Sequence, residues 1–278
     1  MTALDMTLVL WVCAFGAGLL GALTGLGGGV VLVPLLAIFF KVDIHYAIGA
    51  SLVSVIATSS GAAAAYVKEG FSNIRIGMFL EIATTVGALA GAYLAGVIST
   101  GAIAIIFGVV LLYSAYLSGR PQPEVRLADR PDPVATRLKL NGSFPGPEGE
   151  LSYYSRRVPM GFGLMFGAGT LSGLLGIGSG AVKVLAMDQA MCIPFKVSTT
   201  TSNFMIGVTA AASAGVYLRR GYIDPSLAMP VMLGVLAGAL LGARVLIRMK
   251  TKLLRYIFGV VIAVMAIEMI YKGTTGRI

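Results

Sequence analysis

Long apolar runs are the feature that most limits what this chain of 278 residues can fold into. A run of about 20 apolar residues spans a bilayer, and such a run becomes a helix because lipid offers unpaired backbone groups no partner. Only 12% of the residues are charged, against about 25% in soluble domains. The runs lie at roughly 7–40, 46–67, 75–98, 101–118, 158–191, 197–218, 225–247 and 253–271. This pattern predicts an all-α polytopic membrane protein.

Charged residues gather in one polar stretch between the fourth and fifth runs. Residues 120–157 hold 12 of the 33 charged residues and six of the 11 prolines. We therefore expect a polar insertion at 119–157, in which 137–142 and 151–154 could pair as a small β-hairpin. The alternative is a disordered linker. The net charge of +9 does not indicate nucleic-acid binding, because basic residues in short loops are what membrane orientation requires.

The chain repeats itself at an offset of 151 residues. Glycines match in one register across about a hundred positions, which shared apolar composition does not explain, so the pattern predicts an internal duplication. We expect a first transmembrane repeat at 1–118 and a second at 158–278. The matches include Gly25 with Gly176, Gly27 with Gly178, Gly29 with Gly180, Ser51 with Ser202, and 107–110 with 258–261.

The first and fifth runs are too long for one span, and each contains a glycine cluster. If each run folds back at its glycines, each repeat is a glycine-broken re-entrant or hairpin segment followed by three transmembrane helices, and the repeats are inverted. If each run is one span, the repeats are parallel. The loop at 99–100 holds no basic residue, whereas its equivalent at 248–252 holds Lys250 and Lys252. This difference favours inverted repeats in the cell membrane, with the insertion cytoplasmic and both termini outside.

Two glycine clusters are each followed by a polar helix start. The clusters are GLGGG at 25–29 and GIGSG at 176–180, and the helix starts are 47–51 and 198–203. This paired arrangement resembles the sulfite exporter TauE/SafE family over nearly all of the chain apart from the insertion. The resemblance implies a permease of two related halves that exports sulfite, sulfoacetate or related organosulfur anions.

Glycine clusters can end a helix at membrane depth and expose its amides, which attract anions. Interrupted helices in two related halves indicate a transporter site near the midplane of the bilayer. Serine and threonine hydroxyls beside them could replace the hydration shell of an oxyanion. The alternative is that the glycines pack helices closely and the hydroxyls cap them. The candidate substrate-binding residues are Gly27, Gly28, Gly29, Ser51, Ser54, Gly178, Ser179, Gly180, Lys183, Thr200, Thr201, Ser202 and Asn203.

Lys183 and Glu81 are ionisable residues inside apolar runs, and such residues are functional hypotheses by default. Lys183 could compensate the charge of a bound anion. It could instead pair with Asp188 or reach the membrane surface. Glu81 is a candidate for proton coupling, although Arg75 six residues earlier also allows a place near the interface. The only histidine, His45, lies in a short loop where we expect a solvated cluster.

These residues favour a secondary transporter that exports small sulfur-containing anions by alternating access around a midplane site. The alternatives are an anion channel-like pore, a transporter of another small anion, and an accessory subunit that uses the insertion. We expect no enzyme, cofactor or metal site, since the sequence shows no Ser/His/acid set, and Cys13 and Cys192 are isolated. No ATP-binding motif is present, so a proton or another ion could drive transport. The sequence leaves open whether the protein is a monomer or a homodimer.

Overall fold

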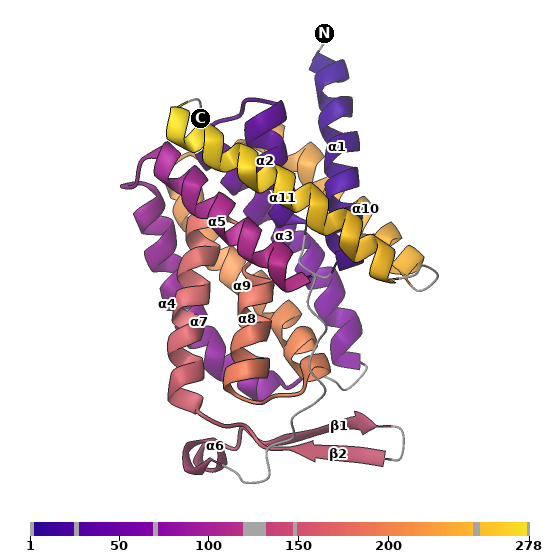
Figure 1. Cartoon of the computed structure of the whole chain (residues 1–278), viewed down its shortest axis with the longest axis vertical. Coiled ribbons are helices and arrows are strands. Elements are labelled where there is room, and N and C mark those ends of the chain that lie inside the picture. The colour runs from indigo at the N-terminus through magenta and orange to yellow at the C-terminus, as the bar shows by residue number, and fades with distance from the viewer. Residues whose placement is uncertain are drawn as a thin grey trace.

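The computed structural model describes residues 3–24, 28–68, 72–118, 132–146, 149–246 and 251–276. Helices make up the body, and one small hairpin lies at the bottom of Figure 1. The elements are α1 (Ala3–Thr24), α2 (Gly29–Phe39), α3 (Ile44–Lys68), α4 (Ile74–Ala95), α5 (Thr100–Ser118), α6 (Pro133–Arg137), β1 (Gly142–Gly146), β2 (Gly149–Tyr153), α7 (Val158–Leu175), α8 (Gly180–Leu185), the π-helix η1 (Ala186–Ala190), α9 (Phe195–Arg219), α10 (Pro225–Leu246) and α11 (Thr251–Thr275).

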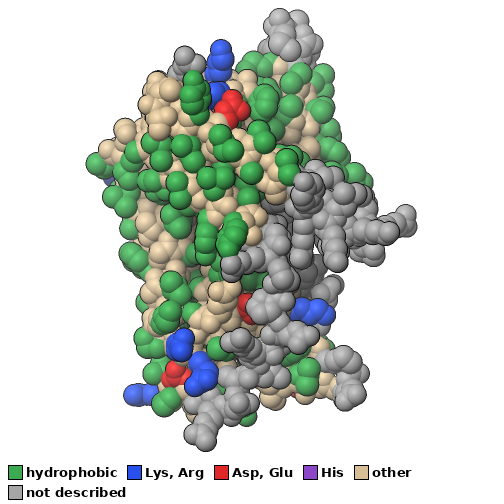
Figure 2. All heavy atoms as spheres, viewed as in Figure 1, with side chains coloured by type: hydrophobic (Ala, Val, Ile, Leu, Met, Phe, Trp, Pro, Cys, Tyr) green, Lys and Arg blue, Asp and Glu red, His purple; other side chains and the backbone are tan. Residues whose placement is uncertain are grey.

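The outer surface of the helical body is apolar, as a lipid-facing surface requires. Large side chains such as Leu8 on α1 and Met78 on α4 are each 62% exposed, and no soluble fold explains so many. In Figure 2 apolar side chains cover the middle of the visible face, and most described charged ones lie near its two ends. Three described helices are long and apolar enough to cross a membrane, at Ile74–Ala95, Val158–Leu175 and Pro225–Gly242. The predicted all-α polytopic membrane fold is confirmed.

Both long apolar runs are broken beside their glycine clusters. The first divides into α1 and α2, and Gly25 to Gly27 between them lie outside the described residues. The second ends α7 at Leu175 and restarts as α8 at Gly180. Gly176 and Gly178 have φ values of +67° and +70°, in the left-handed region that side-chain-bearing residues rarely adopt. The glycines therefore allow the chain to leave the helix between α7 and α8.

The element boundaries of the two halves follow the offset of 151 residues. Adding 151 to the first and last residue numbers of α3 gives those of α9, and the same addition converts the bounds of α4 into those of α10. The bounds of α2 correspond in the same way to the segment formed by α8 and η1 together. The helices α5 and α11 begin at equivalent residues, Thr100 and Thr251.

Helices of one half pack on helices of the other. The helix α1 packs against α10, α4 against α7, and α3 against α9. Glycines allow the closest approach: a methyl group at Gly87 would overlap the carbonyl oxygen of Phe166, and one at Gly238 would overlap that of Phe15. These two contacts are equivalent at the same offset, so the α4–α7 and α1–α10 crossings have the same geometry.

Equivalent helices run in opposite directions where they pack directly. On α5 and α11, Gly101 lies against Gly273, whereas Gly108 lies against Ala266 and Ile270. Residue numbers therefore rise along one helix as they fall along the other. In Figure 1 α1 begins at the top, whereas α7 begins at the bottom beside the hairpin, and both chain ends lie at the top.

The insertion contributes α6 and an antiparallel hairpin, with Gly142 opposite Tyr153 and Gly146 opposite Gly149. The sequence predicts the first strand at 137–142. This strand begins instead at Gly142, and Arg137 is the last residue of α6. The hairpin is docked on the helices: Tyr153 is 1% exposed and its hydroxyl accepts a hydrogen bond from Asn73 Nδ2 at 2.6 Å. Residues 119–131 and 147–148 lie outside the described part of the chain.

Candidate functional site

The two interrupted segments meet between α3 and α9. A methyl group built on Gly29, at the start of α2, would lie 2.7 Å from Ser51 Oγ and 3.1 Å from the carbonyl oxygen of Gly176. Ser51 Oγ in turn donates a hydrogen bond of 2.8 Å to that carbonyl. Ser51 thus links the first half to the break in the second half, and a side chain at residue 29 would displace the Ser51 hydroxyl from this position.

The second half repeats this packing with its own residues. Gly180, the equivalent of Gly29, lies against Ile206, and Ser202 Oγ donates to the Gly180 carbonyl oxygen at 3.3 Å. Gly178 lies between Ile206 and Val55, so it also touches both halves. At the first break, Gly28 is the N-cap residue of α2 and packs on Val235.

Most of the candidate hydroxyls bond to backbone groups in this structure. Ser54 Oγ donates to Ala50 O at 2.9 Å, and Thr200 Oγ1 donates to Lys196 O at 3.0 Å, each within its own helix. Thr201 Oγ1 accepts from the backbone N–H of Asn73 at 3.1 Å. Asn203 is half-buried on α9. The glycines and hydroxyls are thus closely packed in this structure.

Ser179 differs from the other candidate hydroxyl residues of the site. It has a φ of +45° as the N-cap residue of α8, and it is 3% exposed. Its Oγ has no hydrogen-bond partner among the described residues. A residue with a side chain in the left-handed region costs about 1–2 kcal/mol, and an unpaired buried hydroxyl adds to that cost. Such a residue is a candidate ligand contact, because a bound oxyanion would supply the missing acceptor.

Lys183 lies one helical turn after Gly180 and is fully buried. Its Nζ donates a hydrogen bond of 2.6 Å to Thr209 Oγ1 on α9. Among the described residues no ion pair joins it to Asp188. Neither alternative for this lysine, the Asp188 pair or a reach to the surface, therefore describes the structure. The structure has a buried ammonium group beside the second break.

Glu81 lies on α4 and is 8% exposed, so it is inside the helical body and not at an interface. Its Oε1 accepts from Thr209 Oγ1 at 2.7 Å and from Thr85 Oγ1 at 3.1 Å. Its Oε2 has no hydrogen-bond partner among the described residues. Arg75 is exposed and donates to Lys139 O at 3.4 Å instead. Glu81 and Lys183 are thus held by the same hydroxyl group.

Thr209 is the residue that the sequence analysis missed. It follows Ser202 by seven residues and precedes Ser213 by four, so all three lie on one helical face. Extending the hydroxyl face of α9 beyond Asn203 would have found it. What the spacing does not show is that Thr209 contacts two ionisable side chains, one on α4 and one on α8.

His45 is not part of a solvated loop. It lies in the first turn of α3, and its ring stacks on Tyr222 with 4.8 Å between ring centres. Its Nε2 lies 2.9 Å from the carbonyl oxygen of Ala95, and its Nδ1 lies 3.0 Å from Asp43 Oδ1. The histidine therefore connects the start of α3 to the end of α4.

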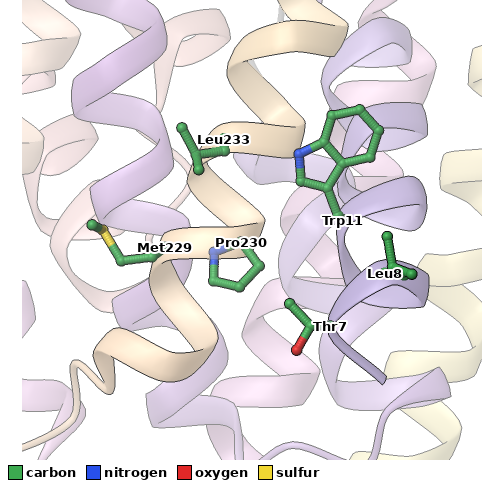
Figure 3. Close-up of a pocket in the computed structure, with 6 residues that line it drawn as sticks. All are labelled: Thr7, Leu8, Trp11, Met229, Pro230 and Leu233. Atoms are coloured by element: carbon green, nitrogen blue, oxygen red, sulfur yellow. The ribbon is translucent and has the colours of Figure 1, made fainter. Parts of the chain in front are cut away.

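Figure 3 shows an open groove between α1 and α10. Its lining is almost wholly apolar, so it offers an anion no charge compensation. The described residues contain no group of three His, Cys, Asp or Glu side chains that could hold a metal ion. The groove is lined by Thr7, Leu8, Trp11, Met229, Pro230 and Leu233.

Comparison with known proteins places the chain among membrane transporters. The model of the family described as "Sulfite exporter TauE/SafE" matches residues 10–269. "Probable membrane transporter protein YunE" of Bacillus subtilis is 29% identical over 273 residues, which cover 95% of this chain and 97% of that protein. "Probable membrane transporter protein YdhB" of the same organism is 28% identical, covering 83% and 86%. A "Probable membrane transporter protein" of Xylella fastidiosa is 25% identical, covering 93% and 91%. No solved structure matches the chain.

Proposed function

Because the chain belongs to the sulfite exporter TauE/SafE family, we propose that it is a secondary transporter that exports small sulfur-containing anions such as sulfite or organosulfonates. The anion binds near the bilayer midplane, where the two interrupted segments meet. Motion of one half against the other exposes this site to each face of the membrane in turn. The protein carries no catalytic activity and binds no nucleic acid.

One observation carries the proposal: a fully buried lysine lies one turn beyond a helix break that contacts the other half. Lys183 supplies the positive charge, and the unpaired hydroxyl of Ser179 supplies a hydrogen-bond donor. Gly29 touches the Gly176 carbonyl, so the two breaks are adjacent. The remaining members of the site become accessible when the halves separate: Gly27, Gly28, Gly178, Gly180, Ser51, Ser54, Thr200, Thr201, Ser202 and Asn203.

We also propose that residues 1–118 and 158–278 are inverted repeats, with the insertion at 119–157 in the cytoplasm and both termini outside. The antiparallel packing of α5 and α11 supports this arrangement. A second support is that Asn73 and its equivalent in the second half, Asp224, are near opposite ends of α4. Asn73 precedes this helix, whereas Asp224 belongs to the loop that packs beside the other end. Asn73 bonds to Tyr153 of the insertion. Arg220, four residues before Asp224, bonds to the carbonyl oxygens of Ala92 and Tyr93 near the other end.

Transport by the purified protein in liposomes tests the proposal. We expect saturable uptake of labelled sulfoacetate or sulfite, and acceleration by unlabelled anion on the opposite side. Counterflow of this kind separates a carrier from the anion channel-like pore, which gives flux without acceleration. Absence of flux for sulfite, sulfoacetate, taurine, thiosulfate and sulfate would leave two alternatives, a transporter of another small anion and an accessory subunit.

Substitution of Lys183 tests its role in the site. Lys183→Met keeps an unbranched side chain of similar length but removes the ammonium group, so sulfoacetate affinity should fall at least tenfold. Lys272→Met serves as the control, because Lys272 lies at the end of α11 and pairs with Glu268 at 3.6 Å. Equal affinities of the two variants would exclude Lys183 from the site.

The glycine breaks are tested by a matched pair of variants. Gly178→Val places a side chain between Ile206 and Val55 at a φ that valine does not favour, so transport should be lost. Gly167→Val on α7 is the control, since a side chain there meets no atom within 4 Å. Normal transport by Gly178→Val would show that the second break serves packing alone.

A further inference from the structure

The Lys183 ammonium group has more hydrogen-bonding capacity than the structure uses. An ammonium group has three donors, and Thr209 Oγ1 is its one partner among the described residues. Glu81 is left incomplete in the same way, because Oε2 lacks a partner among those residues. Buried polar groups are normally paired, so two incomplete groups on one hydroxyl indicate a place that a ligand or proton completes.

The two charges compensate each other through Thr209. Burying a lone charge costs several kcal/mol even after relaxation, so Lys183 and Glu81 each need an opposite charge nearby. Both lie within hydrogen-bond distance of one oxygen, at 2.6 Å and 2.7 Å. An anion that binds the free donors of Lys183 would bring a second negative charge beside Glu81.

We infer that Glu81 is the internal counter-anion of Lys183, and that a monovalent anion such as a sulfonate binds Lys183 together with one proton that neutralises Glu81. This inference rests on the proposed function and names its substrate class and its coupling group. The net charge of the buried group is zero in both states. Without the anion it consists of the Glu81 carboxylate and the Lys183 ammonium group. With the anion it consists of the Glu81 carboxylic acid, the Lys183 ammonium group and the sulfonate. A divalent anion would leave one uncompensated negative charge.

Thr209 can serve both states without moving far. Its hydroxyl has one proton, and its nearest acceptors are Glu81 Oε1 at 2.7 Å and Met205 O at 2.9 Å, with Thr84 Oγ1 farther away at 3.5 Å. When Glu81 is a carboxylate, Thr209 donates to it. When Glu81 is protonated, the carboxylic acid donates to Thr209, and the Thr209 proton turns to Met205. Thr209 is thus a positioning residue that keeps Glu81 and Lys183 in contact.

Other ionisable groups on the surrounding helices are remote from this pair in sequence. The helix α7 packs on α4 and α8 and carries no ionisable side chain. The ionisable residues of α9 are Lys196, Tyr217 and Arg219, those of α4 are Arg75 and Tyr93, and that of the segment α8–η1 is Asp188. Each of these is at least five residues from Glu81, Lys183 or Thr209 along its own segment. The helix α3, which also packs on α9, carries His45, Tyr46, Tyr66 and Lys68. The titratable groups that Thr209 joins are Glu81 and Lys183, and the Glu81→Gln variant separates their contributions.

The set of Lys183, Glu81 and Thr209 has no counterpart at the equivalent positions of the duplicated sequence. At the offset of 151 residues, Lys183 corresponds to Leu32 and Glu81 to Met232, whereas Thr209 corresponds to Thr58. Among the described residues, the Thr58 hydroxyl bonds within its own helix, to Ser54 O at 3.0 Å and Val55 O at 3.2 Å. We therefore expect one proton and one anion in each transport cycle.

The experiment measures isethionate binding to the purified protein in liposomes at a series of pH values, together with proton uptake reported by a pH-indicator dye. Isethionate keeps a single negative charge throughout, so its own titration does not contribute. For the unmodified protein, affinity should rise up to tenfold for each unit of pH decrease while Glu81 titrates, with one proton taken up per anion. Sulfate should bind more weakly than isethionate.

Variants distinguish coupling from structure. Glu81→Gln should bind isethionate with an affinity independent of pH and without proton uptake. Thr209→Val should reduce the pH slope, Thr209→Ser should restore it, and the control Thr58→Val should retain the slope of the unmodified protein. If Thr209→Val does not fold, Glu81→Gln and Thr209→Ser still give the result.

Two results overturn the inference. One is binding by the unmodified protein that is independent of pH and without proton uptake, and the other is an unchanged slope in Glu81→Gln. In both cases anion transport itself would stand. Absence of isethionate, sulfoacetate and sulfite binding at every pH would instead remove the proposed function together with this inference.

Discussion

Ser179 is a residue whose backbone conformation conflicts with its type. Its φ is +45°, whereas Gly28, at the equivalent place in the first half, has an ordinary φ of −63°. Ser179 therefore has a backbone conformation that glycine adopts without strain, whereas Gly28 has a conformation that does not require glycine. A strained residue is retained where the surrounding structure or a ligand compensates it.

Replacing this serine should separate stability from binding. Ser179→Gly removes both the side chain and its strain, so the protein should become about 1 kcal/mol more stable than Ser179→Ala, which keeps the strain. Both variants lose the hydroxyl group, so both should bind sulfoacetate more weakly than the unmodified protein. Thermal unfolding in detergent and anion binding provide the two readouts. Ser179→Gly and Ser179→Ala of equal stability would show that the conformation at this residue is not strained.

At the scale of single elements, the α4–α7 and α1–α10 pairs depend on glycines that face a partner backbone. Membrane helices gain little from the hydrophobic effect when they associate within lipid, so close backbone contact matters more than in water. Gly87 on α4 and Gly238 on α10 make this contact with carbonyl oxygens of α7 and α1. Their loss should weaken each crossing alike, because the two contacts are equivalent.

The glycine contacts can be tested with the smallest side chain. Gly87→Ala and Gly238→Ala should each destabilise the protein by about 2 kcal/mol, because overpacking forces the helices apart. Gly163→Ala, at a place on α7 where a methyl group meets no atom within 4 Å, should be neutral or stabilising by up to about 1 kcal/mol. Unfolding midpoints in detergent compare the three variants. Equal midpoints for Gly87→Ala and Gly163→Ala would mean that the α4–α7 crossing tolerates separation.

At the scale of the whole molecule, what the sequence predicts depends on whether the contact is local. The apolar runs and the break at Gly176 can be predicted, because helix formation and glycine conformation are local properties. The bond from Ser51 to Gly176 joins residues 125 positions apart, and no pattern shows it. Thr209 is missed for a related reason: threonines in helices usually bond to their own backbone, as Thr58 does. The first hairpin strand begins later than expected, at Gly142, because α6 extends to Arg137 and non-helical residues follow it.

The orientation of the halves is a property of the whole molecule, and accessibility from each side of the membrane tests it. In a background with Cys13→Ser and Cys192→Ser, Arg219→Cys at the end of α9 should react with an impermeant maleimide in intact cells. Ser143→Cys in β1 should react only after the membrane is opened. Both positions are exposed in the structure, so a lack of reaction reports the membrane and not burial. The prediction follows because α4, which connects these two ends, is long and apolar enough to cross a bilayer. Labelling of both cysteines in intact cells would contradict the inverted arrangement, because Asn73, which bonds to the hairpin, and its equivalent, Asp224, would then lie on one face of the membrane.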